Sequence, residues 1–173
     1  MIRIIAATAV AALLAACNGE PGQEKKAADK ASALQAGEYE IGQTIAEVSS
    51  TDGTTPATKL QAGAAVEGEA RRICVGEDGV LSAMAFAEGN DECESENSYM
   101  RAGKLSMQLR CRRPGTEGPV MQAADGRFTA DSFEADVTTT TYFIGTGDYR
   151  MRRQVTGQRV GDCPAGEAAN TAG

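Results

Sequence analysis

The chain has 173 residues, enough for one domain of ordinary size, and carries a net charge of -7. It contains no histidine, so the commonest general base and the commonest metal ligand are both missing, and no Ser-His-Asp or Cys-His nucleophile system can be built. The acidic balance argues against nucleic acid as a partner. We therefore expect no metal, no cofactor and no enzymatic activity. The remaining enzyme hypothesis, chemistry by carboxylates alone, would need two buried carboxylates close together in a cleft.

The N-terminal segment has the pattern of a bacterial export signal. Arg3 precedes a short apolar run, and a membrane-spanning helix would need about 20 apolar residues. The run ends in the sequence LAAC at residues 14–17, which resembles the lipobox of bacterial lipoproteins. The resemblance implies a signal peptide over residues 1–16 and a lipidated Cys17, whose acyl chains (palmitate among them) form a membrane anchor. An ordinary cleaved signal, with Cys17 a chance residue, is the alternative.

The segment after the cysteine has the composition of a tether. Residue Asn18 stands where an aspartate tends to retain Gram-negative lipoproteins in the inner membrane, so the resemblance implies an outer-membrane lipoprotein facing the periplasm. Residues 17–36 mix Gly, Pro, Glu, Lys and Ala, which bury too little surface to offset the entropy of ordering, and we expect a flexible linker there. Residues 165–173 are similar. The folded domain is then predicted over residues 37–164.

Most of the predicted domain consists of strands. The apolar and polar patterns, with their turn signals, predict strands at residues 38–49, 66–75, 92–100, 104–112, 119–123, 127–143 and 148–160. Helical spacing of apolar residues predicts a short helix over 77–87, and turns are expected at Asp125-Gly126 and at residues 145–147. Short turns favour antiparallel neighbours. The expected fold class is all-β with one short helix: an antiparallel meander forming a curved sheet, a sandwich or a partly closed barrel.

Four cysteines lie in the predicted domain: Cys74, Cys93, Cys111 and Cys163. An even number in an oxidising compartment predicts two disulfides, and the absence of any C-x-x-C spacing disfavours a redox dithiol or a zinc ribbon. Cys93 and Cys111 flank the hairpin predicted over residues 92–112, whose open end can bring two residues within disulfide distance. We therefore favour Cys93–Cys111 with Cys74–Cys163, while the other two connectivities remain open.

Two arginine clusters are the candidate binding residues. Arg110 and Arg112 share one face of a predicted strand, as do Arg150 and Arg152 on another. If the two strands lie near each other, the four side chains form a basic strip that could bind lipid phosphates or lipopolysaccharide, because guanidinium matches phosphate as a bidentate fork. The alternative is a solvated sheet face whose arginines pair with local acids. The acidic segment 88–96 lacks the pattern of a calcium-binding loop.

The ends of the predicted domain carry a family resemblance. The sequence GQRVGDCP closes it at residues 157–164, AGEYE opens it at residues 36–40, and CVGE at residues 74–77 precedes the predicted helix. Together with Cys93 and Cys111, these segments resemble the uncharacterised domain-of-unknown-function family 3617 of proteobacterial envelope proteins. The resemblance implies architecture and location in the cell but no activity.

From these features we expect a lipid-anchored, non-enzymatic domain of the cell envelope. Its partner would be an envelope component or another protein, in addition to the membrane that holds the anchor. The alternative is a carrier of a small apolar ligand, with a cavity inside the curved sheet.

Overall fold

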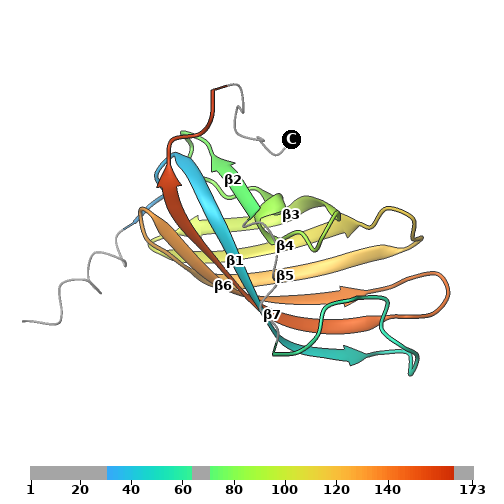
Figure 1. Ribbon diagram of the computed structural model, residues 1–173. Coiled ribbons are helices and arrows are strands. Elements are labelled where there is room, and N and C mark those ends of the chain that lie inside the picture. Colours follow the sequence, from blue (N-terminus) through green and yellow to red (C-terminus); the bar gives the residue numbers. More distant parts are fainter. Residues whose placement is uncertain (1–30, 64–70, 166–173) are drawn as a thin grey trace, which may run out of the picture.

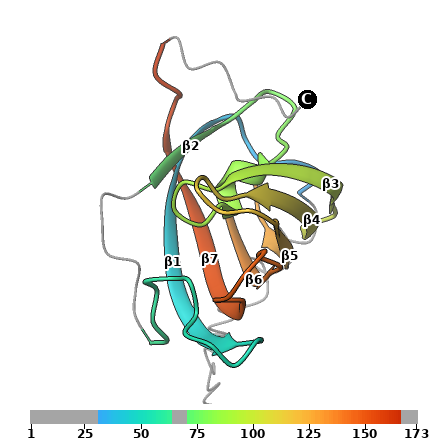
Figure 2. The same cartoon turned by 90° about the vertical axis from the view of Figure 1, so that its right-hand side faces the viewer.

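One antiparallel sheet accounts for most of the structure. The computed structural model describes residues 31–63 and 71–165. The sheet has seven strands in the order β2-β1-β7-β6-β5-β4-β3. In chain order the elements are β1 (Gly37–Ser50), β2 (Arg71–Val75), η1 (Ala83–Phe86), β3 (Glu92–Arg101), β4 (Lys104–Arg112), β5 (Pro119–Phe128), β6 (Ser132–Thr141) and β7 (Tyr149–Gly161). Strands β3 to β7 form a meander, and the sheet curls into a half-barrel with β2 and β3 at its edges (Figures 1 and 2). The all-β meander is confirmed.

Side chains alternate between the two faces of the sheet. Strand β4 is the clearest case: Leu105, Met107, Leu109 and Cys111 are buried, whereas the residues between them are exposed. Strand β7 follows the same period of two over most of its length. Because successive strand side chains point to opposite faces, this pattern places one face of the curl in the core and the other in solvent. The concave face forms the core, and the convex face carries the exposed strand residues, many of them charged.

The helix predicted over residues 77–87 is wrong. The structure has only the four-residue 3-10 turn η1 in that region, capped by the Ser82 side chain. Gly79 adopts a φ of +65°, and its N–H bonds to Gly76 O, so a tight turn precedes η1. This turn occupies backbone groups that a helix would need, and Asp78 supports it by accepting from Val80 N. Of the apolar residues expected along one side of a helix, Leu81 and Ala85 are buried in the core, whereas Val80 is 46% exposed.

The turn predicted at Asp125-Gly126 is also wrong. Both residues lie inside β5, and Gly126 is paired with Leu105 on one side and with Ala135 on the other. The chain reverses a few residues later, where the Thr129 side chain accepts from the N–H groups of the next residues. A Cβ on Gly126 would lie 2.0 Å from Glu134 O. This glycine therefore permits close approach of two strands rather than a reversal of the chain.

The described chain begins to pack before the predicted start of the domain. Leu34, which we assigned to the flexible linker, is 4% exposed, and its N–H bonds to Gly79 O at 3.1 Å. The N–H of Gln35 bonds to Ala130 O at 2.6 Å. Residues 31–36 are thus part of the folded unit. The predicted signal peptide, Cys17, the rest of the predicted linker and residues 166–173 lie outside the described residues. Within the described part, no helix has the length and apolar character needed to cross a bilayer.

Two disulfides hold the edges of the sheet. One joins neighbouring strands of a hairpin, and the other joins two segments that are far apart in the sequence. Cys93 and Cys111 are direct partners on β3 and β4, with their Cα atoms 4.0 Å apart. Cys74 on β2 joins Cys163, which follows β7, at a Cα separation of 5.7 Å. These are the two pairs favoured from the sequence. The second one ties the short edge strand and the end of the chain's last strand together across β1.

Candidate functional site

The four candidate arginines lie on the convex face, but they do not form one continuous strip. Arg110 and Arg112 lie on β4 and Arg150 and Arg152 on β7, and all four are exposed. Strands β5 and β6 separate the two pairs. Three strand spacings correspond to about 14 Å along a flat sheet. The register aligns the pairs along the strand direction, because Arg110 faces Met121, Met121 faces Thr140, and Thr140 faces Arg150.

The two arginine pairs differ in their local partners. Arg110 lies 3.9 Å from Glu96, and Arg112 pairs with Glu92 on the neighbouring edge strand β3. These are exposed ion pairs, which contribute roughly 0.2 to 1 kcal/mol each. Arg150 and Arg152 make no ion pair with any described residue. The β4 pair therefore fits the alternative of a solvated face with local acids, and the β7 pair is the better candidate for binding an anion.

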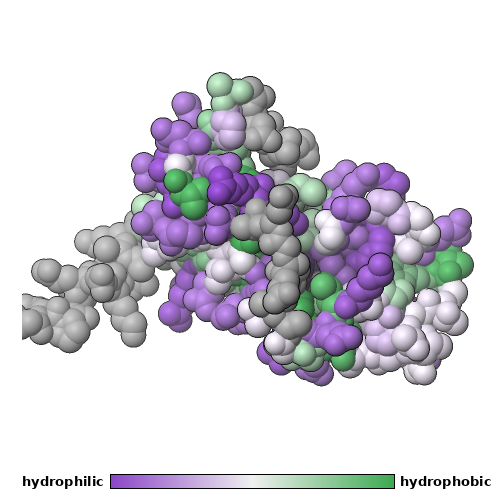
Figure 3. Space-filling view, viewed as in Figure 1, coloured by the Kyte–Doolittle hydropathy of each residue, from purple (hydrophilic) through white to green (hydrophobic). Residues whose placement is uncertain are grey.

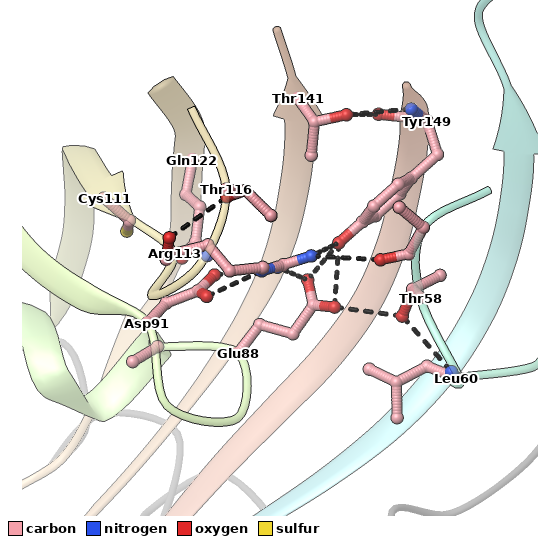
Figure 4. A network of polar contacts seen from close by, with 12 residues as sticks. Thr58, Leu60, Glu88, Asp91, Cys111, Arg113, Thr116, Gln122, Thr141 and Tyr149 are labelled. Atoms are coloured by element: carbon pink, nitrogen blue, oxygen red, sulfur yellow. Dashed lines mark hydrogen bonds and ion pairs between the residues drawn. The ribbon is translucent and has the colours of Figure 1, made fainter. Parts of the chain in front are cut away.

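A buried polar network, which the sequence analysis missed, lies at the end of the half-barrel where β4 ends and β7 begins (Figure 4). Its centre is Arg113. The Arg113 guanidinium binds Asp91 through two parallel bonds of 2.7 and 2.8 Å, and Nη2 lies 3.1 Å from Glu88 Oε2. Nη1 donates to Tyr149 Oη at 2.8 Å. Asp91 is 1% exposed and Glu88 is 8% exposed, so both carboxylates depend on Arg113 for their charge compensation.

The same network extends to a second loop and to two aromatic rings. Tyr149 Oη donates to the Glu88 carboxylate at 2.8 Å, and Thr58 Oγ1 donates to Glu88 Oε1 at 3.0 Å. The guanidinium carbon of Arg113 lies 5.6 Å from the ring centre of Phe143 and 5.7 Å from that of Tyr149. Cation–π contacts of this kind add stabilisation where the cation is desolvated. The network therefore joins the loop at residue 58, the loop after η1, the end of β4 and the start of β7.

The ionisation of the network suits a structural role. Burial, and then the charge of Glu88, raise the pKa of Tyr149 well above its ordinary value, so the phenol stays protonated. Burial alone would lower the pKa of Arg113, but the bonds to Asp91 and the charge of Glu88 outweigh it and raise that pKa. Neither group can exchange a proton near neutral pH. The two carboxylates are buried as the enzyme hypothesis requires, yet Arg113 holds both of them.

Two hollows are described on the surface. The larger has a volume of about 720 Å³ and is open to solvent; its lining includes Met84, the Cys93–Cys111 disulfide, Arg110 and Arg112. The smaller, of about 310 Å³, lies between Tyr99 and Arg127. Neither is lined by Glu88 or Asp91. The two hollows thus offer no place for a substrate beside the buried carboxylates.

Around η1, apolar side chains pack on the concave face, where a carrier would hold its ligand. Phe86 of η1 is fully buried and meets Phe133 edge-on, with ring centres 5.9 Å apart. Phe128 and Leu81 pack into the same core cluster. An apolar ligand would have to displace η1. Within residues 31–63 and 71–165, no cluster of three acidic or cysteine side chains could hold a metal ion.

The fold and the disulfides define a class: an all-β half-barrel with one curled antiparallel sheet, closed over its concave face by a 3-10 turn and stapled by two cysteine pairs. The chain matches the model of a family described as protein of unknown function (DUF3617) over residues 34–163, and it belongs to that family. No curated protein and no solved structure matches the chain.

Proposed function

We propose that this protein is a lipoprotein of the outer membrane that faces the periplasm, with a non-enzymatic binding domain held on a lipidated Cys17. Four of the five cysteines are joined in two disulfides, which leaves Cys17 as the odd one. Disulfides form and persist in oxidising compartments such as the periplasm. The lipobox-like sequence before Cys17 supports lipidation, and two or more acyl chains would make the anchor effectively permanent.

The proposed binding surface is the arginine pair on β7, with an anionic envelope component as its partner. The observation that carries this proposal is that Arg150 and Arg152 are exposed neighbours on one face and make no ion pair with a described residue. On the face seen in Figure 3 the surface is mostly hydrophilic, and its hydrophobic residues form small separate groups. Such a surface favours a polar partner, and phosphate groups of lipopolysaccharide match the guanidinium fork.

The anchor is tested by metabolic labelling with an alkyne analogue of palmitate. We expect the wild-type protein to carry the label and Cys17→Ser to carry none, because the serine hydroxyl is not a substrate for thioether formation. Cys17→Ser keeps the two domain disulfides, so it does not disturb the fold. An unlabelled wild-type protein, or a labelled Cys17→Ser variant, would contradict the proposal.

The binding surface is tested by cosedimentation with vesicles that contain lipopolysaccharide, using the full chain with Cys17→Ser so that the anchor does not contribute. Replacing both Arg150 and Arg152 with glutamine is expected to weaken binding about 30-fold, from roughly 1 kcal/mol for each cation at an anionic surface. The matched control replaces Lys104 and Arg127, two exposed cations on the same convex face, with glutamine. Equal losses in the two double variants would show a nonspecific charge effect and overturn the site.

A further inference from the structure

The interior of the half-barrel contains a guanidinium that contacts no carboxylate of the described residues. Arg153 on β7 is 1% exposed. It donates to Gln43 Oε1 at 2.5 Å, to Gln122 Oε1 at 3.3 Å and to the main-chain oxygen of Phe86. These acceptors belong to β1, β5 and η1, so the curl of the sheet makes three separate elements converge on one side chain. All three acceptors are neutral, and Arg153 makes no ion pair with any described residue.

No described carboxylate contacts Arg153, although the charges of Glu88 and Asp91 act on it from a distance. Burial lowers the pKa of Arg153 to about 10, so the group is still cationic at neutral pH. Arg71 and Arg113 also reach into the interior, whereas the buried carboxylates among the described residues are Glu88 and Asp91, and both bind Arg113. Counted with the half-buried Arg71, these groups carry three positive charges and two negative ones, so one positive charge is in excess. A buried charge without a counter-ion costs several kcal/mol, which a bound anion would remove.

The unused hydrogen-bonding capacity beside Arg153 consists of donors. Three buried side-chain atoms of this region have no hydrogen-bond partner among the described residues: Arg153 Nε, Gln122 Nε2 and Thr139 Oγ1. Gln122 and Thr139 are direct partners on β5 and β6, so they share the concave face, and Gln122 touches Arg153. The two nitrogens can only donate, and the hydroxyl can donate as well. A partner for all three must accept hydrogen bonds and carry negative charge.

We propose that the concave face binds one small monovalent anion among Arg153, Gln122 and Thr139. Chloride and the carboxylate of a small organic acid are the two sources of this chemistry. A water molecule would accept hydrogen bonds but leave the charge unbalanced. Its binding would not depend on the anion concentration, so an experiment that varies the anion distinguishes the two. The site is on the face opposite to Arg150 and Arg152, so it stands or falls independently of the proposed envelope-binding surface.

The test measures the melting temperature of the full-length protein at constant ionic strength while chloride or formate replaces gluconate, a carboxylate much larger than formate. Binding to the native state alone stabilises it by mass action. We expect the melting temperature to rise by about 3 to 6 °C for each tenfold increase in anion above the dissociation constant. A larger response to formate than to chloride would identify the carboxylate as the preferred form. An unchanged melting temperature in both salts would overturn the proposal.

Two variants locate the effect. Gln122→Glu places a carboxylate beside Arg153 and is expected to abolish the anion dependence, whereas the exposed Gln108→Glu on the convex face makes the same charge change and should keep it. Thr139→Val removes one donor with little change of shape and should lower the affinity for the anion about tenfold or more. A melting temperature of Gln122→Glu that still depends on the anion as in the wild type would contradict the site. If Gln122→Glu does not fold, the same result with Thr139→Val would contradict it.

Discussion

Replacing Arg113 with methionine is expected to lower the free energy of unfolding by about 3 to 5 kcal/mol, because it leaves two buried carboxylates without their counter-ion. Asp91 and Glu88 both bind this guanidinium, at 2.7 and 3.1 Å. Methionine keeps much of the aliphatic length, so lost packing contributes little of the effect. Urea denaturation of the wild type and the variant under identical conditions measures the difference.

The matched control for this experiment is Arg110→Met. Arg110 is exposed and lies 3.9 Å from Glu96, an ion pair of roughly 0.2 to 1 kcal/mol. A third variant adds Glu88→Gln and Asp91→Asn to Arg113→Met and removes the unpaired charges, and we expect it to recover part of the loss. Equal effects of Arg113→Met and Arg110→Met would show that the network does not depend on the buried charge. No recovery in the triple variant would assign the loss to shape instead.

Replacing Cys74 and Cys163 together with alanine is expected to cost about 4.5 kcal/mol, the larger effect of the two disulfides. The cysteines are 89 residues apart in the sequence, whereas Cys93 and Cys111 are 18 apart. In the chain-entropy model, the shorter loop contributes only about 3 kcal/mol, because closing a longer loop removes more conformations of the unfolded chain.

The measurement compares urea unfolding of the two double variants, Cys74→Ala/Cys163→Ala and Cys93→Ala/Cys111→Ala, with that of the wild type. Each double variant removes both sulfurs of one pair and leaves no free thiol in the domain. The larger loss should belong to the pair that joins β2 to the end of β7. The opposite order would mean that local contacts between β3 and β4, rather than loop closure, decide how much each disulfide stabilises.

The alternation of residues along the strands made much of the fold predictable. Leu105 to Cys111 alternate in burial as expected, and the same reasoning puts Arg150 and Arg152 on one face and Arg153 on the other. Reversals were less predictable, because Gly126 has two different uses in a sheet: it can form a turn or let neighbouring strands approach closely. Only the pairing of Gly126 with Leu105 on one side and Ala135 on the other, inside β5, distinguishes the two uses.

Some features of the candidate sites were also predictable from the sequence, and others were not. The convex arginines were found from spacing on single strands, but their separation by β5 and β6 depends on strand order. The sequence did not distinguish Arg113 from the exposed arginines, because its partners Asp91 and Tyr149 are 22 and 36 residues away in the sequence. The network they form, and the convergence of Gln43 and Gln122 on Arg153, require the whole sheet to curl.

By itself, the sequence determined the all-β class and the meander, because both depend on local periodicity and on short turns. It determined the family resemblance through short motifs and the favoured pairing of the cysteines through a predicted hairpin. Tertiary structure alone decided which charged side chains are enclosed. Arg113 and Arg153 are buried because the sheet curves and because the segment that contains η1 crosses its concave face. Curvature sums small twists over many strands, and no short stretch of residues encodes such a sum.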